Sequence, residues 1–284
     1  MSPAVGSAPE LRIGVSGWRY PSWRGDFYPK GLPQRLELTY AADRMTAVEV
    51  NGSFYSLQRP RSYAAWAAAV PEDFRFAVKG GRFITHMKKL AGVETALANF
   101  FASGVLALGD KLGPVLWQLP ERLAFDEQRL ESFFALLPRT TSGVAALARR
   151  HDDKLADDRV LTTPVSERPV RHALEPRHPS FETAQAREVL RRNDICMVIA
   201  DSAGRWPQMP DATSAFRYVR LHGETELYAS GYTDDSLDRW AHQCQAWLDE
   251  GHDVHVYFDN DARGHAPYDA VRLLDRLGWS PATS

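Results

Sequence analysis

The chain has 284 residues, of which 44% are hydrophobic and 25% charged, and its formal net charge is −2 at pH 7. This length and apolar content suit one large α/β domain or two small ones, and the near-neutral charge gives no overall attraction to nucleic acid. No run approaches the roughly 20 apolar residues of a membrane span, and residues 1–10 lack the features of a secretory signal. Cys196 and Cys244 show neither a metal-ligand spacing nor a disulfide pattern. We therefore expect a soluble, cytoplasmic protein.

Short apolar or alternating runs recur along the chain and are typical of β-strands. They predict eight strands, over residues 12–16, 46–51, 74–79, 114–119, 170–175, 195–200, 216–222 and 254–259. Amphipathic stretches predict helices between them, over residues 36–45, 61–70, 94–108, 126–137, 181–192 and 236–250, with another helix after residue 264. This alternation predicts one TIM-type (β/α)₈ barrel over residues 11–279, with loose termini at 1–10 and 280–284. An open doubly wound sheet is the alternative.

Two segments depart from the alternation. After Ala200 the sequence DSAGRWPQMPDATS is too rich in Pro and Gly for a normal helix, so the helix after the sixth strand should be shortened or missing. The polar stretch between Leu137 and Val165 holds an expected helix at residues 144–150, followed by HDDKLADDR. This stretch fits either an insertion at the barrel rim or a long helix with a solvated face. We favour the solvated face, because charge runs usually face solvent.

Side chains alternate between the two faces of a strand, so each strand sends every second residue into the barrel. In residues 46–51 the apolar Val48 and Val50 should meet the helices, which leaves Glu49 and Asn51 in the lumen. The same alternation sends polar side chains of five other strands inward, namely Arg75, Lys79, Gln118, Arg171, Glu175, Tyr218, Arg220, His222, His255, Tyr257 and Asp259. Because barrel interiors normally hold branched apolar residues, these groups must satisfy one another or bind something.

The last strand runs into three consecutive polar residues. By alternation Asp259 faces the lumen and is the candidate for chemistry, whereas Asn260 and Asp261 are expected to shape the turn.

Seven motifs, spread over nearly the whole chain, match one known family. They are IGVSGW (13–18), VEVNGSFY (48–55), FAVKG (76–80), LGPVLWQLP (112–120), ALEPRHPSF (173–181), YVRLHG (218–223) and VYFDNDARGHAPYDA (256–270). In this order they resemble the domain of unknown function 72 family, also called YecE-like. The resemblance implies a TIM-type barrel but no activity, since the family has no established reaction. ALEPRHPSF departs from the family's EFRHxSW pattern at Pro176 and Phe181, and keeps Glu175, Arg177 and His178.

The charged lumen suggests an enzyme for an anionic substrate that is phosphorylated, nucleotide-like or a nucleic acid. The expected general acids and bases are Glu49, Glu175, Asp259 and His222. The expected substrate-binding residues are Asn51, Lys79, Gln118, Arg177, Arg220, Tyr257, Trp18 and Tyr55, whose cations would hold the anion. Hydrolase, lyase or isomerase chemistry fits such groups. The competing interpretation is an ion-pair network in which the same charges neutralise one another.

Two further possibilities use neighbouring residues. A divalent metal could bind His222 with Glu49, Glu175, Asp201 and Asp259, but nearby Lys and Arg would repel it, so we expect no cofactor. A non-catalytic protein could instead bind nucleic acid or another polyanion, because GWRYPSWRGDFYPKGLPQR after the first strand interleaves aromatic and basic residues and 79–89 is a second basic run. The same aromatic residues would otherwise form a packed lid, which is usual for Trp and Tyr in long loops.

Overall fold

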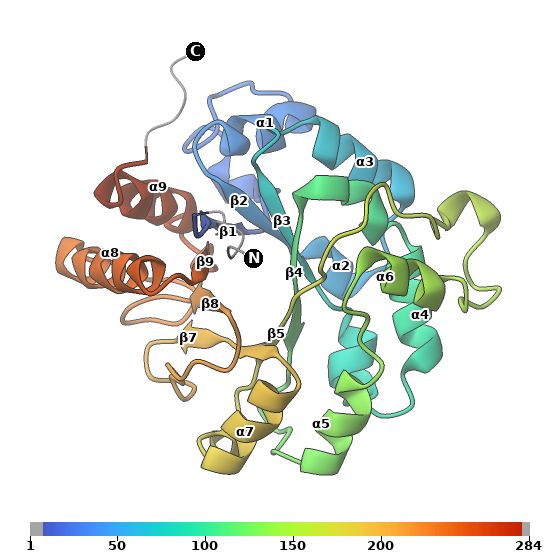
Figure 1. The fold of residues 1–284 in the computed structure, drawn as a ribbon. Coiled ribbons are helices and arrows are strands. Elements are labelled where there is room, and N and C mark those ends of the chain that lie inside the picture. The colour runs from blue at the N-terminus through green and yellow to red at the C-terminus, as the bar shows by residue number, and fades with distance from the viewer. Residues whose placement is uncertain (1–7, 280–284) are drawn as a thin grey trace, which may run out of the picture.

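The strands form one parallel sheet at the centre of the molecule. A computed structural model describes residues 8–279. The strands in this part are β1 (Leu11–Ser16), β2 (Ala47–Val50), β3 (Arg75–Lys79), β4 (Leu112–Gln118), β5 (His172–Glu175), β6 (Ile195–Met197), β7 (Ile199–Asp201), β8 (Phe216–Leu221) and β9 (Asp253–Phe258). Their order in the sheet is β6-β5-β4-β3-β2-β1-β9-β8-β7. Figure 1 shows them surrounded by helices.

The sheet closes into a barrel through residues 195–201. β6 pairs with β5 and β7 pairs with β8, and only Val198 separates β6 from β7. The backbone N–H of Val198 donates to the carbonyl of Leu174 at 2.9 Å. The predicted strand 195–200 therefore forms both β6 and β7, and the predicted TIM-type barrel is confirmed. An open sheet is wrong, because the two end strands of this order, β6 and β7, are consecutive in the chain and joined through Val198 alone.

Most helices cover the outside of the barrel (Figure 1). They are α1 (Glu37–Ala42), α2 (Gly52–Tyr55), α3 (Pro60–Ala68), α4 (Glu94–Ala102), α5 (Glu127–Phe134), α6 (Thr141–Ala148), α7 (Ala184–Arg192), α8 (Asp234–Asp249) and α9 (Ala266–Arg276). Side-chain caps fix several starts: Asp126, Thr183 and Thr233 each accept a hydrogen bond from the backbone N–H three residues later.

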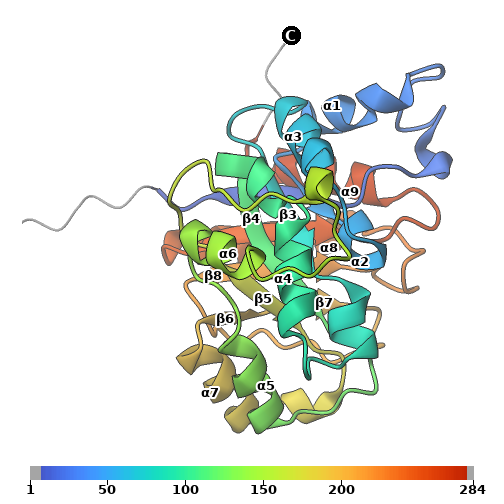
Figure 2. The same cartoon turned by 90° about the vertical axis from the view of Figure 1, so that its right-hand side faces the viewer.

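Two predicted helical regions differ in the structure. The helix expected at 94–108 ends at Ala102, because Gly104 has a φ of 118° and a 3₁₀ segment, Val105–Lys111, follows it. The polar stretch after Leu137 forms no long helix. It contains the short α6, which packs against α4 (Figure 2), and then an irregular segment.

The segment between β7 and β8, residues 202–215, is fully described and contains no helix, as its Pro and Gly content predicts. Thr213 fixes this segment to the barrel. Its Oγ1 donates to the carbonyl of Ile195 at 2.6 Å and accepts from the N–H of Met197 at 2.7 Å. The Ile195 carbonyl and the Met197 N–H point away from β5, toward the side on which β8 lies. The Thr213 hydroxyl therefore makes the hydrogen bonds that β8 would otherwise make with β6.

A layer of apolar and aromatic side chains lies inside the barrel. It contains Ala47, Ala77, Leu116, Ala173, Cys196, Val198, Phe216, Tyr218 and Tyr257. Val48 and Val50 belong to the separate core between sheet and helices, as the strand alternation predicts. The Ala residues leave room for the rings of Tyr218 and Tyr257, whose centroids are 5.0 Å apart. Tyr218 of this layer contacts the charged residues, since its hydroxyl donates to Glu49.

The predicted loose termini lie outside the described residues, apart from residues 8–10. There, the N–H of Glu10 donates to Oδ1 of Asp253 at 2.7 Å, and the Glu10 carboxylate pairs with Arg12 and Arg75. Of the helices within residues 8–279, none combines the length and apolarity that crossing a bilayer requires.

Candidate active site

Arg220 on β8 is the centre of a buried charge network. Its side chain is fully buried, and Nη2 lies 2.8 Å from Oε1 of Glu49, while Nη1 lies 2.7 Å from Oε2 of Glu175. Nη2 also lies 3.0 Å from Oδ2 of Asp259. Three carboxylates from different strands therefore share one guanidinium, which compensates the cost of burying their charges.

Glu49 uses both carboxylate oxygens within this network. Oε1 accepts a hydrogen bond from Oγ of Ser16 at 2.6 Å and from Arg220, and Oε2 accepts from the Tyr218 hydroxyl at 2.7 Å and from Nε of Arg220 at 3.1 Å. The side chain is fully buried. Glu49, predicted as a general acid or base, thus serves as an anchor for Arg220 and has no face open to a substrate.

Glu175 is also paired. Its Oε1 accepts from Nε of Arg177 at 3.0 Å, and the Arg177 guanidinium lies 3.5 Å from the centroid of the Trp206 ring. Burial opposes ionisation of Glu175, but the charges of Arg177 and Arg220 outweigh it and hold its pKa well below the usual range. The two arginines expected to bind an anion are therefore already neutralised.

His222 bridges two carboxylates from a fully buried position. Its Nδ1 lies 3.1 Å from Oδ2 of Asp259, and its Nε2 lies 3.3 Å from Oε1 of Glu175 without the alignment of a hydrogen bond. His222 therefore orients Asp259 and does not line an open space.

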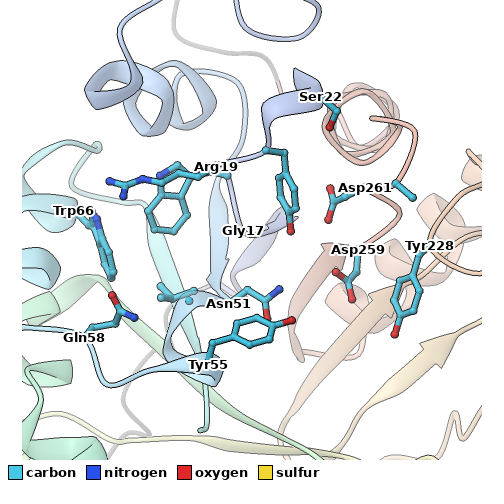
Figure 3. A pocket seen from close by; sticks show the side chains of 15 residues that line it. Gly17, Arg19, Ser22, Asn51, Tyr55, Gln58, Trp66, Tyr228, Asp259 and Asp261 are labelled. Atoms are coloured by element: carbon cyan, nitrogen blue, oxygen red, sulfur yellow. The ribbon is translucent and has the colours of Figure 1, made fainter. Parts of the chain in front are cut away.

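A pocket of about 640 Å³ opens beside this network at the ends of β1, β2 and β9 (Figure 3). Its walls are formed by Gly17, Trp18, Arg19, Tyr20, Ser22, Val50, Asn51, Gly52, Tyr55, Gln58, Trp66, Tyr228, Asp259, Asp261 and Ala262. Figure 3 shows Trp66 and Gln58 on one side, with Asp259, Asp261 and Tyr228 opposite them and Asn51 and Tyr55 between. The pocket thus has an aromatic end and an acidic end.

Four of the predicted site residues line the pocket: Trp18, Asn51, Tyr55 and Asp259. The other predicted site residues do not line the pocket. They are Glu49, Glu175, His222, Arg177 and Arg220 in the network, Lys79 and Gln118 near the ends of β3 and β4, and Tyr257 in the apolar layer.

Sequence reasoning missed Asp261, Tyr20 and Tyr228. Asp261 was expected to shape the turn, but its side chain lines the pocket. One feature of the sequence indicated this position: Asp261 lies only two residues after Asp259, beyond the end of the same strand. Asn260 does fix the loop, since its Nδ2 donates to the carbonyl of Ser230 and to Oδ2 of Asp269, both at 2.9 Å.

The two pocket carboxyls have opposite ionisation properties. Burial disfavours a charge on Asp259, but Arg220 and the hydrogen bond with His222 outweigh it and lower the pKa of Asp259. Burial, together with the negative charge of Asp259, raises the pKa of Asp261 well above its ordinary value. The pocket therefore contains one carboxyl whose surroundings favour the ionised form and one whose surroundings favour the protonated form.

Two oxygen atoms in the pocket are buried without a hydrogen-bond partner, Oδ1 of Asp261 and Oδ1 of Asn51. Buried polar atoms are normally satisfied, so these are positions where a bound molecule could complete the bonding. Tyr228 beside them has a φ of 63°, and its N–H donates to the carbonyl of His222 at 2.5 Å. Such a conformation in a non-glycine residue is uncommon and frequent at functional sites.

The aromatic residues of the first loop form a packed lid. Trp23, Phe27 and Tyr28 are buried and contact one another, with ring centroids 5.3–5.7 Å apart. Trp18 is also buried and meets Trp66 edge-on at 5.2 Å. The faces of these four rings are therefore not displayed for stacking on nucleic-acid bases.

The residues considered as metal ligands are not arranged for that purpose. Within residues 8–279 no group of three or more His, Cys, Asp or Glu side chains could hold a metal ion. Glu49, Glu175 and Asp259 surround Arg220 instead.

The chain is similar to proteins of one family along nearly its whole length. The family described as "Protein of unknown function DUF72" matches residues 12–284. UPF0759 protein YunF of Bacillus subtilis (strain 168) is 23% identical over 281 residues, which cover 94% of each chain. A DUF72 family structure from Thermotoga maritima MSB8 has a TM-score of 0.74 at 23% identity and covers 95% of this chain and 100% of that one. Another, from Enterococcus faecalis V583, has a TM-score of 0.71 at 19% identity and covers 95% of this chain and 96% of that one. The chain belongs to the DUF72 family of proteins of unknown function.

Proposed function

We propose that this protein is an enzyme that performs general acid–base catalysis in the pocket, with Asp259 as the proton acceptor and Asp261 as the proton donor. The observation that supports this most is that two carboxyls from one strand end, one with a lowered and one with a raised pKa, face the same pocket. Pairs of carboxyls with displaced pKa values are the usual source of an acid and a base at one pH.

The network gives each carboxyl a defined role. Arg220 and His222 hold Asp259 ionised and oriented, so it takes up a proton without first breaking a solvent shell. The raised pKa of Asp261 favours its protonated form, from which a proton can pass to a leaving or carbonyl oxygen.

The lining of the pocket favours an uncharged substrate. An anion would meet the ionised Asp259, while Arg177 and Arg220 are already paired. Arg19 is the cation among the lining residues. The substrate class proposed here is therefore a neutral polar molecule, in place of the anionic one that the sequence suggests.

The walls also define the shape of this substrate. The volume of about 640 Å³ is within the range of small-molecule sites. Trp66 and Tyr55 offer aromatic surface, and Asn51 and Gln58 offer amide groups. A molecule with a flat apolar face and several hydroxyl or carbonyl groups, such as a sugar, matches this combination.

A panel of p-nitrophenyl compounds tests the proposal. We expect turnover of a neutral glycoside or ester in preference to p-nitrophenyl phosphate, and a loss of at least about 100-fold in kcat/KM in D259N and in D261N. Asp275→Asn, an exposed change on α9, is the matched control and should retain wild-type turnover. Activity that survives in both pocket variants, or turnover restricted to the phosphate, would contradict the proposal.

A further inference from the structure

Lys79, the last residue of β3, differs from the other buried lysine of the described chain. Lys111 is also buried, but its Nζ donates to the carbonyls of Ala67 and Val70 at 2.8 and 2.9 Å and lies 3.5 Å from Glu72. Lys79 is only 6% exposed, yet its Nζ makes no hydrogen bond or ion pair with any residue of the range 8–279. This Nζ lies 4.5 Å from the centroid of the Phe54 ring.

The carboxylates around Lys79 are occupied by other groups. Glu49 and Asp259 are bonded to Arg220, and Glu175 is bonded to both Arg177 and Arg220. These carboxylates favour the ammonium form of Lys79 through space, but burial and the positive charge of Arg220 act against it. The balance lowers the pKa of Lys79 to about 8.

A neutral histidine lies on the same aromatic ring as Lys79. His86, in the π-helical turn Phe83–Met87, meets Phe54 edge-on with centroids 5.1 Å apart. Its Nδ1 lies 2.9 Å from Oγ1 of Thr85, which itself donates to the Gly81 carbonyl, so Nδ1 carries the proton and Nε2 accepts from Nε2 of Gln118 at 3.4 Å. Burial, with the charges of Arg177, Lys79 and Arg82, lowers the pKa of His86 to about 4.

We propose that Lys79 is a nucleophilic amine that forms an imine with a small aldehyde or ketone at the C-terminal face of the barrel. A desolvated lysine next to another cation is the arrangement that makes an amine reactive at neutral pH. With a pKa of about 8, roughly a tenth of the Lys79 side chains are neutral at pH 7 and about half at pH 8.

The reaction needs no partner beyond the carbonyl compound. The Nζ lone pair forms the N–C bond, the C=O π electrons move to oxygen, and that oxygen takes up a proton. The hydroxyl of the resulting carbinolamine takes up a proton from solvent and leaves as water, the remaining N–H proton returns to solvent, and C=N forms. Addition of water reverses these steps and releases the carbonyl compound, so atoms and electrons balance without an oxidant. The inference does not depend on the roles of Asp259 and Asp261.

Reductive trapping tests this inference on the wild-type chain. The protein is incubated at pH 7.5 with glycolaldehyde or dihydroxyacetone, reduced with sodium borohydride, digested and mapped by mass spectrometry. The sequence contains six lysines, so every site can be followed. We expect Lys79 to be modified at least about tenfold faster than the exposed Lys30, Lys88, Lys89 and Lys154. Modification confined to the exposed lysines, or no faster at Lys79, would overturn the proposal.

Variants separate this inference from the proposed acid–base function. Lys79→Arg keeps the charge and should lose the reduced adduct at this site, while the exposed Lys30→Arg should leave trapping at Lys79 unchanged. D261N should abolish turnover of the p-nitrophenyl substrate and still be trapped at Lys79. Because the trapping readout uses the wild-type chain, the result stands even if Lys79→Arg folds poorly.

Discussion

Asp259 and Asp261 lie two residues apart and differ in ionisation. Arg220 contacts Asp259 directly and stabilises its negative charge, whereas burial, together with that charge on Asp259, disfavours ionisation of Asp261. The ionisation of one carboxyl is therefore linked to that of the other.

This coupling predicts how the stability of the protein depends on pH. The folded-state pKa of Asp261 lies above its unfolded value, so its contribution is fully present below the unfolded pKa of about 4 and is lost as the pH rises toward the folded value. Asn carries no charge at any pH. Relative to the wild type, D261N should therefore gain stability between pH 4.5 and pH 7.5, by about 2 °C or more in Tm.

Thermal melts of both proteins at pH 4.5, 6 and 7.5 check this expectation. Asp275→Asn should keep a constant Tm difference from the wild type over the same range. If the Tm difference between D261N and the wild type stays constant or shrinks with rising pH, Asp261 is ionised in the folded protein. A more stable but inactive D261N would fit a carboxyl kept for catalysis at a cost in stability.

At the scale of elements, the segment 202–215 replaces an outer helix with a few specific contacts. Thr213 is the clearest of them, because its single hydroxyl satisfies backbone groups at both ends of β6. Thr213→Val should leave a buried N–H and a buried C=O unsatisfied and lower the free energy of unfolding by about 2–4 kcal/mol.

Urea denaturation at pH 7 measures this loss, and Thr213→Ser is the matched control. Ser keeps the hydroxyl and loses only a methyl group, so it should cost about 1 kcal/mol. Equal losses in the two variants would mean that packing, and not the hydroxyl, secures the segment.

The elements differ in how far they could be predicted. Alternation along β2 and β9 was sufficient to place Glu49, Asn51 and Asp259 inside the barrel, because the two-residue period is a local property of a strand. Alternation could not show that the Glu49 carboxylate is bonded to Arg220, since this hydrogen bond joins residues 171 positions apart. Tyr228 was missed because it lies in a loop, where no periodicity fixes the path of the chain.

At the scale of the molecule, eight predicted strands with intervening helices indicated the barrel, but not the way it closes. At β6, the backbone groups of Met197 and Ile195 bond to Thr213, which lies 16 and 18 positions further along the chain. Nothing in the apolar run of residues 195–200 signals the interruption at Val198. The family resemblance pointed to the same fold, which the match to residues 12–284 supports.

A closed barrel predicts cooperative unfolding. Every strand from β1 to β9 has a partner on the sheet, and residues 195–201 connect β5 to β8, so no sector of the described chain should melt alone. The eight tryptophans are spread from Trp18 to Trp279 and report on most of the barrel. In guanidinium chloride, tryptophan fluorescence and far-UV circular dichroism should give the same midpoint. Midpoints separated by more than about 0.3 M would reveal an independently unfolding part.

The Thr213 contact has a consequence for association between copies of the chain. Along β6 one hydroxyl, and not a neighbouring strand, covers the backbone groups of Ile195 and Met197. If heating or proteolysis lifts residues 202–215 away, those groups become a bare strand edge that can template a strand from a second molecule. Aggregation of this barrel would then begin at β6, and a protease cut between β7 and β8 would promote it.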